Sequence, residues 1–279
     1  MRINGLGREA CTMQTLFLDI DNTLIYSHRH VLDVPKRAVE FLNGKVQSFI
    51  TETTYACLAA RRDIQIVPVT TRSLAQYERI AQLLYELGCG PALVCNGGVL
   101  LRDGKVEPSW LDESLRLSAA EREELPTACC WLQGKCGAGS THEVSELFVY
   151  AVTDDPARIA DGLGQIVDTR KVDILCDSRK VYCIPKTLNK GTAVRRFIQQ
   201  YKIPFAAAAG DSFFDVPMLD LADAAIVPAS LSEKTKNERK IVVYGTACFS
   251  DEICTVLDDV FAGKKNRQDT AGVKGPLGK

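Results

Sequence analysis

Two aspartates separated by a single residue follow a short apolar run near the start of the sequence. The stretch TLFLDIDNTLIY (residues 15–26) places Asp19 and Asp21 at the end of this run. A short apolar run that ends in acidic residues is typical of a buried parallel strand. Two carboxylates so close together repel each other, and each is costly to remove from water. The pair therefore indicates either a bound cation or a reaction that uses carboxylates.

Polar side chains also follow two other apolar runs. Residues 70–72 (Thr-Thr-Arg) follow IQIVPV, and residues 210–212 (Gly-Asp-Ser) follow FAAAA, while Lys190 begins the predicted helix before the latter run. Ligands of open α/β sheets bind at the carboxyl ends of the strands, so we expect these groups to share one crevice. Several carboxylates together with other hard oxygen ligands suit Mg²⁺. The sequence thus predicts a magnesium site beside a hydroxyl group and an ammonium group.

The elements that must position these residues alternate in type along the chain. The pattern predicts strands, a hairpin with an Asn-Gly turn, and helices. In chain order these are a strand at 15–20, the hairpin at 38–51, a helix at 52–62, a strand at 64–72, a helix at 74–87 and a strand at 92–98. This alternation favours an α/β fold with a Rossmann-like, doubly wound parallel sheet.

The order of predicted helices and strands changes between residues 99 and 185. This segment reads as a hairpin around Asp-Gly (99–108), a charged helix (111–125), a strand (144–152), a helix (156–166) and two strands about a turn (172–185). The alternation typical of a parallel sheet then resumes. It comprises a helix at 190–201, a strand at 205–210, short strands in AAIVPAS and KIVVY, and a helix at 251–262. We therefore predict a core formed by 1–98 and 186–262, an inserted α+β cap domain at 99–185, and a disordered tail at 263–279.

Composition excludes several classes of function. The 279 residues are 46% hydrophobic and 25% charged with a formal net charge of −1, which predicts a soluble globular protein of about two domains without a nucleic-acid or membrane footprint. No apolar run reaches transmembrane length, and the first residues contain no apolar signal core, so we expect a cytoplasmic protein, with Met13 as an alternative start. The 11 cysteines are expected to be reduced. CCWLQGKC (129–136) contains no CxxC pair and is interpreted as packing, not as a metal site. Nothing in the sequence indicates an oligomeric state.

Four stretches resemble the motifs of the haloacid dehalogenase superfamily of phosphohydrolases, in the same order and across nearly the whole chain. DIDNTL resembles DxDx[TV], VTTR resembles the strand that ends in Thr or Ser, NKG resembles the motif that carries a Lys, and GDSFFDVPML resembles GDxxxDxxM. The insertion resembles the large α+β cap of the branch that contains sugar phosphatases, sucrose-phosphatase-like enzymes and phosphomannomutases. The turn CNGG resembles the point at which that branch enters its cap.

The resemblance implies a role for each motif residue. Asp19 would be the nucleophile that forms an aspartyl-phosphate, and Asp21 would be the general acid and then the general base. Thr70 and Lys190 would hold the phosphoryl oxygens. The resemblance also implies that Mg²⁺ is held by Asp19, the main-chain carbonyl of Asp21, Asp211 and Asp215. The remaining predicted substrate contacts are Thr71, Arg72 and Asn96.

The predicted function is that of a Mg²⁺-dependent phosphatase that hydrolyses a small phosphorylated metabolite, such as a sugar phosphate. One alternative is a phosphosugar mutase, for which a basic cap face would hold a second phosphate; the candidates are Arg158, Arg170, Lys171 and Arg179. Another alternative is a regulatory module without turnover. Single residues also have structural alternatives, since Asp21 could form a turn and Asp215 could be a helix N-cap.

Overall fold

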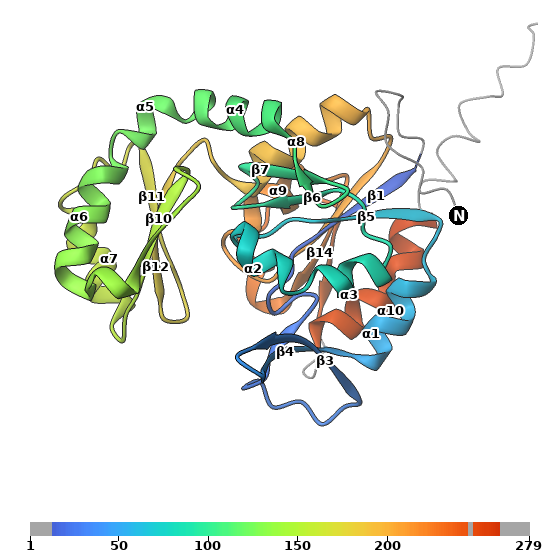
Figure 1. The fold of residues 1–279 in the computed structure, drawn as a ribbon. Coiled ribbons are helices and arrows are strands. Elements are labelled where there is room, and N and C mark those ends of the chain that lie inside the picture. The colour runs from blue at the N-terminus through green and yellow to red at the C-terminus, as the bar shows by residue number, and fades with distance from the viewer. Residues whose placement is uncertain (1–12, 245–247, 263–279) are drawn as a thin grey trace, which may run out of the picture. The chain divides into compact units, whose positions relative to one another are not determined.

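A computed structural model describes residues 13–244 and 248–262 (Figure 1). The predicted disordered tail at 263–279 and the residues before Met13 lie outside this range. The described chain divides into two compact units. One contains the described parts of 1–67, 82–89 and 197–279, and the other contains 68–81 and 90–196. The predicted boundaries of the inserted domain, 99 and 185, stay a prediction. Within the described range, no helix is both long enough and apolar enough to span a membrane.

A parallel sheet forms the centre of the first unit. In the described residues it has five strands in the order β15-β14-β13-β1-β5, and the pairs β1–β13, β13–β14 and β14–β15 are parallel. The strands are β1 (Gln14–Leu18), β5 (Ile64–Pro68), β13 (Ala206–Ala209), β14 (Ala224–Pro228) and β15 (Lys240–Val243). β1 and β13 are apolar throughout because parallel strands are covered on both faces. This sheet confirms the predicted α/β fold class.

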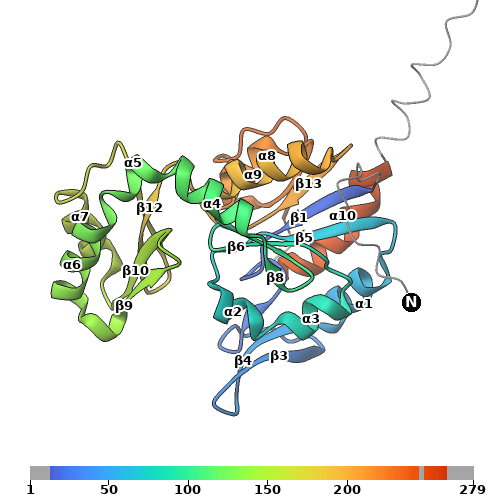
Figure 2. The same ribbon diagram turned by 45° about the horizontal axis from the view of Figure 1, so that its top comes forward.

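Helices cover the sheet on both sides (Figure 1, Figure 2). α9 and α10 both pack against β13 and β14, and they do so from opposite sides in these views. Phe17 of β1 meets Phe197 of α8 edge-on, with ring centroids 5.6 Å apart. The helices named here and their neighbours are α1 (Glu52–Ala60), α2 (Leu74–Glu78), α3 (Ala81–Glu86), α8 (Lys190–Tyr201), α9 (Val216–Leu221), the short 3₁₀ turn Ala229–Leu231 and α10 (Phe249–Ala262).

The predicted hairpin at 38–51 is present, and its turn explains why it was recognisable. β3 (Lys36–Leu42) and β4 (Lys45–Thr51) pair in antiparallel fashion, with β2 (Tyr26–Ser27) on the other side of β4. Asn43 and Gly44 have φ angles of 51° and 72°, which a two-residue turn of this kind requires and which Asn-Gly adopts readily. Thr51 ends β4 and caps α1, because its hydroxyl accepts the Thr54 amide at 3.0 Å.

The strand predicted at 92–98 does not join the parallel sheet. β6 (Ala92–Val94) pairs with β7 (Val99–Arg102) in a separate antiparallel sheet that also contains β8 (Lys105–Val106). Its parallel contact is the isolated bridge between Val69 and Leu93. The expectation of a third strand in the parallel sheet was therefore wrong. The Asp-Gly hairpin predicted at 99–108 is confirmed by the pairing of β7 and β8.

The second antiparallel sheet lies within the predicted insertion. Its order in the described residues is β11-β12-β10-β9, and α6 and α7 pack on one face (Figure 1). Residues such as Val149, Val181 and Leu163 join the two layers in one apolar core. The elements of the segment are α4 (Pro108–Leu117), α5 (Ala119–Arg122), α6 (Leu125–Cys136), the 3₁₀ turn Ala138–Ser140, β9 (Thr141–Val144), β10 (Phe148–Val152), α7 (Pro156–Gly164), β11 (Val172–Asp177) and β12 (Lys180–Pro185).

Three predicted elements are divided in the structure. The helix predicted at 111–125 breaks at Ser118, whose φ and ψ are −97° and 6° and whose hydroxyl donates to the Ser114 carbonyl at 2.8 Å. The strand predicted at 144–152 is a hairpin of β9 and β10, because Ser145 and Glu146 take φ angles of 50° and 59°. The helix predicted at 74–87 is divided into α2 and α3.

Candidate metal and phosphoryl-transfer site

Asp19 and Gly210 leave the parallel sheet side by side. The register of β1 and β13 pairs Leu18 with Ala209, and the Asp19 amide donates to the Ala209 carbonyl at 3.0 Å. The residue after β1 is Asp19 of DIDNTL, and the residue after β13 is Gly210 of GDSFFDVPML, so the first and fourth predicted motifs begin next to each other. Asp19 is buried, with 6% of its surface exposed.

The loop after Asp19 turns sharply and places Thr23 against the fourth motif. Asn22 has a φ of 60°, which Asn tolerates better than most residues, and its amide donates to the Ile25 carbonyl at 2.8 Å. Thr23 is fully buried, and its hydroxyl donates to Oδ1 of Asp211 at 2.8 Å. Thr23 is not among the site residues predicted from the sequence. The available signal was its position in DIDNTL, where the motif specifies Thr or Val.

Asp215 organises the loop that carries Asp211. Its Oδ2 accepts hydrogen bonds from the amides of Asp211 at 3.1 Å and Ser212 at 2.9 Å, and from the Ser212 hydroxyl at 2.8 Å. The Asp215 side chain is fully buried and makes no capping hydrogen bond to α9. Asp215 is thus the N-cap residue of α9, as the structural alternative had it, but its carboxylate serves the Asp211 loop instead of the helix. Ser212 is a second residue whose role the sequence analysis missed.

Gly210 is required by the position of Asp215. A Cβ atom at residue 210 would lie 2.4 Å from Cγ and 2.8 Å from Oδ2 of Asp215. Real Cβ contacts this short essentially never occur, so a larger residue would displace the carboxylate or the loop. The Gly and the second Asp of GDSFFD therefore form one packed unit.

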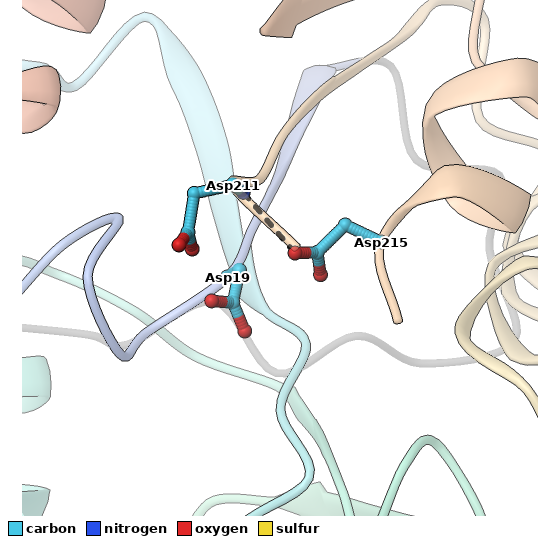
Figure 3. A group of neighbouring side chains, drawn as sticks. All are labelled: Asp19, Asp211 and Asp215. Carbon is cyan, nitrogen blue, oxygen red and sulfur yellow. Dashed lines mark hydrogen bonds between the residues drawn. The ribbon is translucent and has the colours of Figure 1, made fainter. Parts of the chain in front are cut away.

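Three carboxylates meet where these loops converge (Figure 3). One oxygen from each of Asp19, Asp211 and Asp215 lies within 4.8 Å of the other two. Oxygens that share one Mg²⁺ at about 2.1 Å are separated by roughly 3–4 Å. Shifts of about an ångström would thus let the three groups share an ion, and their all-oxygen character suits a hard cation. Asp21 is half-buried and is not a member of this carboxylate group; its predicted metal contact was through the main-chain carbonyl.

The second motif is held by main-chain hydrogen bonds within the second unit. The Thr70 amide donates to the Leu93 carbonyl at 2.9 Å, and the Asn96 amide donates to the Thr70 carbonyl at 2.8 Å. The Thr70 hydroxyl accepts the Arg72 amide at 3.1 Å. Thr70 and Arg72 are buried, whereas Thr71 is partly exposed. These bonds tie the predicted residues 70–72 to the turn that contains Asn96.

Asn96 has a structural contact and an unsatisfied acceptor. Its side-chain amide donates to the Leu188 carbonyl at 2.8 Å, which links this turn to the chain before α8. Its Oδ1 is buried without a hydrogen-bond partner. Buried amide oxygens are rarely left unsatisfied, so Asn96 retains the capacity to accept one more hydrogen bond.

Solved structures resemble about nine-tenths of the chain, whereas no protein-family model and no curated protein matches its sequence. A sucrose-phosphatase from Synechocystis sp. PCC6803, solved with sucrose and phosphate, is 15% identical with a TM-score of 0.57, over 90% of this chain and 99% of that one. A sugar phosphatase of HAD subclass IIB is 13% identical with a TM-score of 0.59, over 88% and 98%. A HAD-superfamily phosphatase from Bacteroides thetaiotaomicron is 16% identical with a TM-score of 0.51, over 93% and 99%.

The chain has the haloacid dehalogenase fold. At this level of identity the likeness is one of fold, so the roles of single residues rest on their own geometry.

Lys190 is the first residue of α8 in this haloacid dehalogenase fold and is almost fully buried, with 1% of its surface exposed. A buried ammonium group is tolerated only with polar or anionic neighbours. The Asn189 side chain caps the helix from the preceding position, since its Oδ1 accepts the Thr192 amide at 2.9 Å. The cap therefore fixes the first turn of α8, and Lys190 with it.

The cysteines of CCWLQGKC lie on α6 and form no group suited to a metal. Cys129 and Cys136 pack against the core of the insertion, and Cys130 is exposed. Within residues 13–244 and 248–262, the carboxylates of Asp19, Asp211 and Asp215 are the group that could hold an ion.

Proposed function

We propose that this protein is a Mg²⁺-dependent phosphomonoester hydrolase that acts on a small phosphorylated metabolite, such as a sugar phosphate. The observation that carries the proposal is the convergence of Asp19, Asp211 and Asp215 at the carboxyl ends of adjacent parallel strands. The haloacid dehalogenase fold supports it, because the structural neighbours include a sucrose-phosphatase and a sugar phosphatase.

In the proposed reaction, Asp19 is the nucleophile. A carboxylate oxygen of Asp19 forms a bond to phosphorus while the bond from phosphorus to the ester oxygen breaks. Asp21 donates a proton to the departing oxygen and then removes a proton from a water molecule. That water attacks phosphorus, which releases inorganic phosphate and restores the Asp19 carboxylate. Both steps balance without an oxidant or a further substrate.

Asp19, Asp211 and the main-chain carbonyl of Asp21 would hold Mg²⁺, and Asp215 would support them by fixing the loop that carries Asp211. When bound, the ion supplies positive charge that offsets the repulsion between Asp19 and an anionic ester. Thr23 contributes by fixing one oxygen of Asp211.

Thr70 and Lys190 are the proposed contacts to the phosphoryl oxygens. Their residue types supply a hydroxyl donor and an ammonium donor, the groups that stabilise negative charge in phosphoryl transfer. Thr71, Arg72 and Asn96 are the proposed substrate contacts. For Asn96 the support is its buried Oδ1, which could accept a hydrogen bond from a substrate hydroxyl.

A phosphosugar mutase is the weaker candidate. It would need a basic surface on the insertion that is able to hold a second phosphate. Three of the four cationic side chains considered for that role form ion pairs with acidic neighbours: Arg170 with Asp168, Lys171 with Glu123, and Arg179 with Asp154. Each pair offsets the positive charge that a second phosphate would require.

The test is a panel of phosphorylated metabolites assayed for inorganic phosphate with Mg²⁺ and, in parallel, with a chelator. We expect Mg²⁺-dependent release from at least one sugar phosphate without added bisphosphate. Asp19→Asn should abolish release, while Asp63→Asn, an exposed control with 62% of its side chain accessible, should retain it. Full activity of Asp19→Asn would refute the mechanism. Strict dependence on a bisphosphate would favour the mutase, and no turnover of any substrate would favour the regulatory module.

The cytoplasmic location, the absence of nucleic-acid and membrane partners, and a small phosphorylated substrate as the partner of the site stay predictions from the sequence.

A further inference from the structure

Helices α1 and α10 are joined by side-chain hydrogen bonds along their length. They lie side by side in both ribbon views (Figure 1, Figure 2). Near their amino ends, the Thr54 hydroxyl donates to Oδ1 of Asp251 at 2.6 Å. Farther along, Nη1 of Arg61 donates to Oδ1 of Asp258 at 2.5 Å. Both pairs are separated by 197 positions in the sequence. Thr54 also contacts Ser250, 196 positions later, so residues of α1 lie beside residues roughly 197 positions later on α10.

This spacing places Cys57 beside Cys254, because 254 − 57 is also 197. The side chains of Cys57 and Cys254 lie close enough that each shifts the pKa of the other. One turn earlier, the hydroxyls of Thr54 and Ser250 are 2.7 Å apart. Thr, Ser and Cys all end in a γ atom, so this short contact shows that the two backbones come close enough for γ atoms to meet. Disulfides need a similar approach, with Cα atoms about 4–7 Å apart.

The surroundings activate Cys57 rather than Cys254. The hydrogen bond from the Cys254 thiol, supported by the nearby Arg61 guanidinium, lowers the pKa of Cys57 to about 7, although burial and the charges of Asp251 and Asp258 act in the opposite direction. The pKa of Cys254 is raised, first by its interaction with Cys57 and then by its partial burial. The lowered pKa of Cys57 favours its thiolate, which is the reactive form of cysteine.

Other buried cysteines show the opposite behaviour. Burial raises the pKa of Cys89 to about 12, and burial together with the charges of Glu124 and Asp173 raises the pKa of Cys183 to about 12. Cys57 and Cys254 are both only partly buried, so a molecule as small as hydrogen peroxide can reach them.

We propose that Cys57 and Cys254 form a redox-active dithiol that reacts with hydroperoxides. The Cys57 thiolate attacks one peroxide oxygen, the O–O bond breaks, and Cys57 becomes a sulfenic acid while hydroxide leaves. The sulfur of Cys254 then attacks the sulfenic sulfur. Its proton and the sulfenic hydroxyl leave as water, and a disulfide remains. The two sulfurs together lose two electrons, and the peroxide gains them. The product links α1 covalently to α10. This inference does not depend on the proposed hydrolase activity.

The experiment uses the full chain, first reduced and then exposed to hydrogen peroxide. Remaining thiols are alkylated, and the digested protein is mapped by mass spectrometry. We expect an intramolecular peptide that links Cys57 to Cys254, with a mass 2 Da below that of the two reduced peptides. Cys176→Ser, which removes an exposed thiol, should form the same link. Cys254→Ser should not form it and should leave Cys57 to accumulate as sulfenic acid.

A second measurement tests the activation of Cys57 without oxidation. The rate of its alkylation by iodoacetamide should reach half its maximum near pH 7. Cys254→Ala should shift this midpoint upward because the donor is lost, and Cys254→Ser should restore it because a hydroxyl also donates. The proposal is overturned if Cys57 stays reduced while Cys176 is oxidised. It is equally overturned if the link forms with another cysteine, or if the alkylation midpoint is above pH 8.5.

Discussion

The contact between Gly210 and Asp215 gives the sharpest prediction. Gly210→Ala adds one methyl group, which would lie 2.4 Å from Cγ and 2.5 Å from Cβ of Asp215. Ordinary van der Waals contacts of a Cβ atom are 3.4–4 Å, so the neighbour must move by about 1 Å or more. Asp215 is completely buried and its carboxylate accepts the Asp211 amide, so a shift of that size disturbs this contact.

The loss of stability expected for Gly210→Ala has two contributions. Overpacking of a well-packed site costs about 1–3 kcal/mol. Displacement of Asp215 also weakens its hydrogen bonds from Asp211 and Ser212, and a hydrogen bond to a charged group is worth about 1.5–3 kcal/mol. We expect Gly210→Ala to lower the free energy of unfolding by about 2–4 kcal/mol. The midpoint of thermal unfolding should fall by roughly 10 °C, because 1 kcal/mol corresponds to about 2–4 °C in a chain of this size.

The assay is urea denaturation of the protein in chelator, which separates stability from any effect of a bound metal. Gly134→Ala is the matched control, since it adds the same methyl group on α6 with nothing within 4 Å. That substitution should raise stability by about 0.5–1 kcal/mol, as expected when Ala replaces Gly inside a helix. If Gly210→Ala is as stable as the unsubstituted protein, the packing argument for the GDSFFD loop is refuted.

Three further predictions concern other contacts. Thr23→Val, which keeps the shape but removes the hydrogen bond to Asp211, should weaken Mg²⁺ binding in calorimetry and lower stability by about 1–2 kcal/mol, whereas Thr23→Ser should retain both properties. Burial raises the pKa of Tyr26, so its contribution to stability is complete below pH 10 and should be lost as the pH rises above 10; alkaline unfolding should be less steep in Tyr26→Phe, and an unchanged slope would contradict this. The hydrogen bond from Arg170 lowers the pKa of Asp168 to about 2, so this carboxylate should stay charged until the pH falls from 4 towards 2, and NMR titration of Arg170→Gln should show a return to the ordinary value.

The parts of the fold that the sequence predicted well have local causes. The hairpin at 38–51 was recognisable because Asn43 and Gly44 supply the positive φ angles of its turn. The turn between β9 and β10 needs positive φ angles as well, but Ser145 and Glu146 supply them, and neither residue type is a turn signal of that kind. From the sequence pattern, an apolar segment interrupted by such a turn cannot be distinguished from one continuous strand. The residue types at this turn therefore do not predict it.

Only part of the carboxylate site could be predicted from the sequence. Asp19 and Asp211 could be brought together from sequence alone because adjacent parallel strands end at the same edge of the sheet. The function of Asp215 could not be derived in this way. Its spacing from Asp211 fits a side chain that caps the helix as well as one that anchors the loop, and only the three hydrogen bonds accepted by its Oδ2 distinguish the two. Likewise, the contact between Thr23 and Asp211 spans 188 positions and depends on a side-chain direction that no local pattern encodes.

The same contacts explain how the fold tolerates its group of acids. Two unit charges 4.8 Å apart repel by about 3 kcal/mol at the effective dielectric constant of a protein site, and this group contains three carboxylates at such distances. The amides of Asp211 and Ser212 stabilise Asp215, and the Thr23 hydroxyl stabilises Asp211, so these donors hold the carboxylates in place. Groups of ionisable side chains this close together occur most often at functional sites, which favours a functional reason for their presence. A divalent cation would neutralise two of the charges, so Mg²⁺ should raise the unfolding temperature, and Asp211→Asn should reduce that increase because one charged ligand is lost.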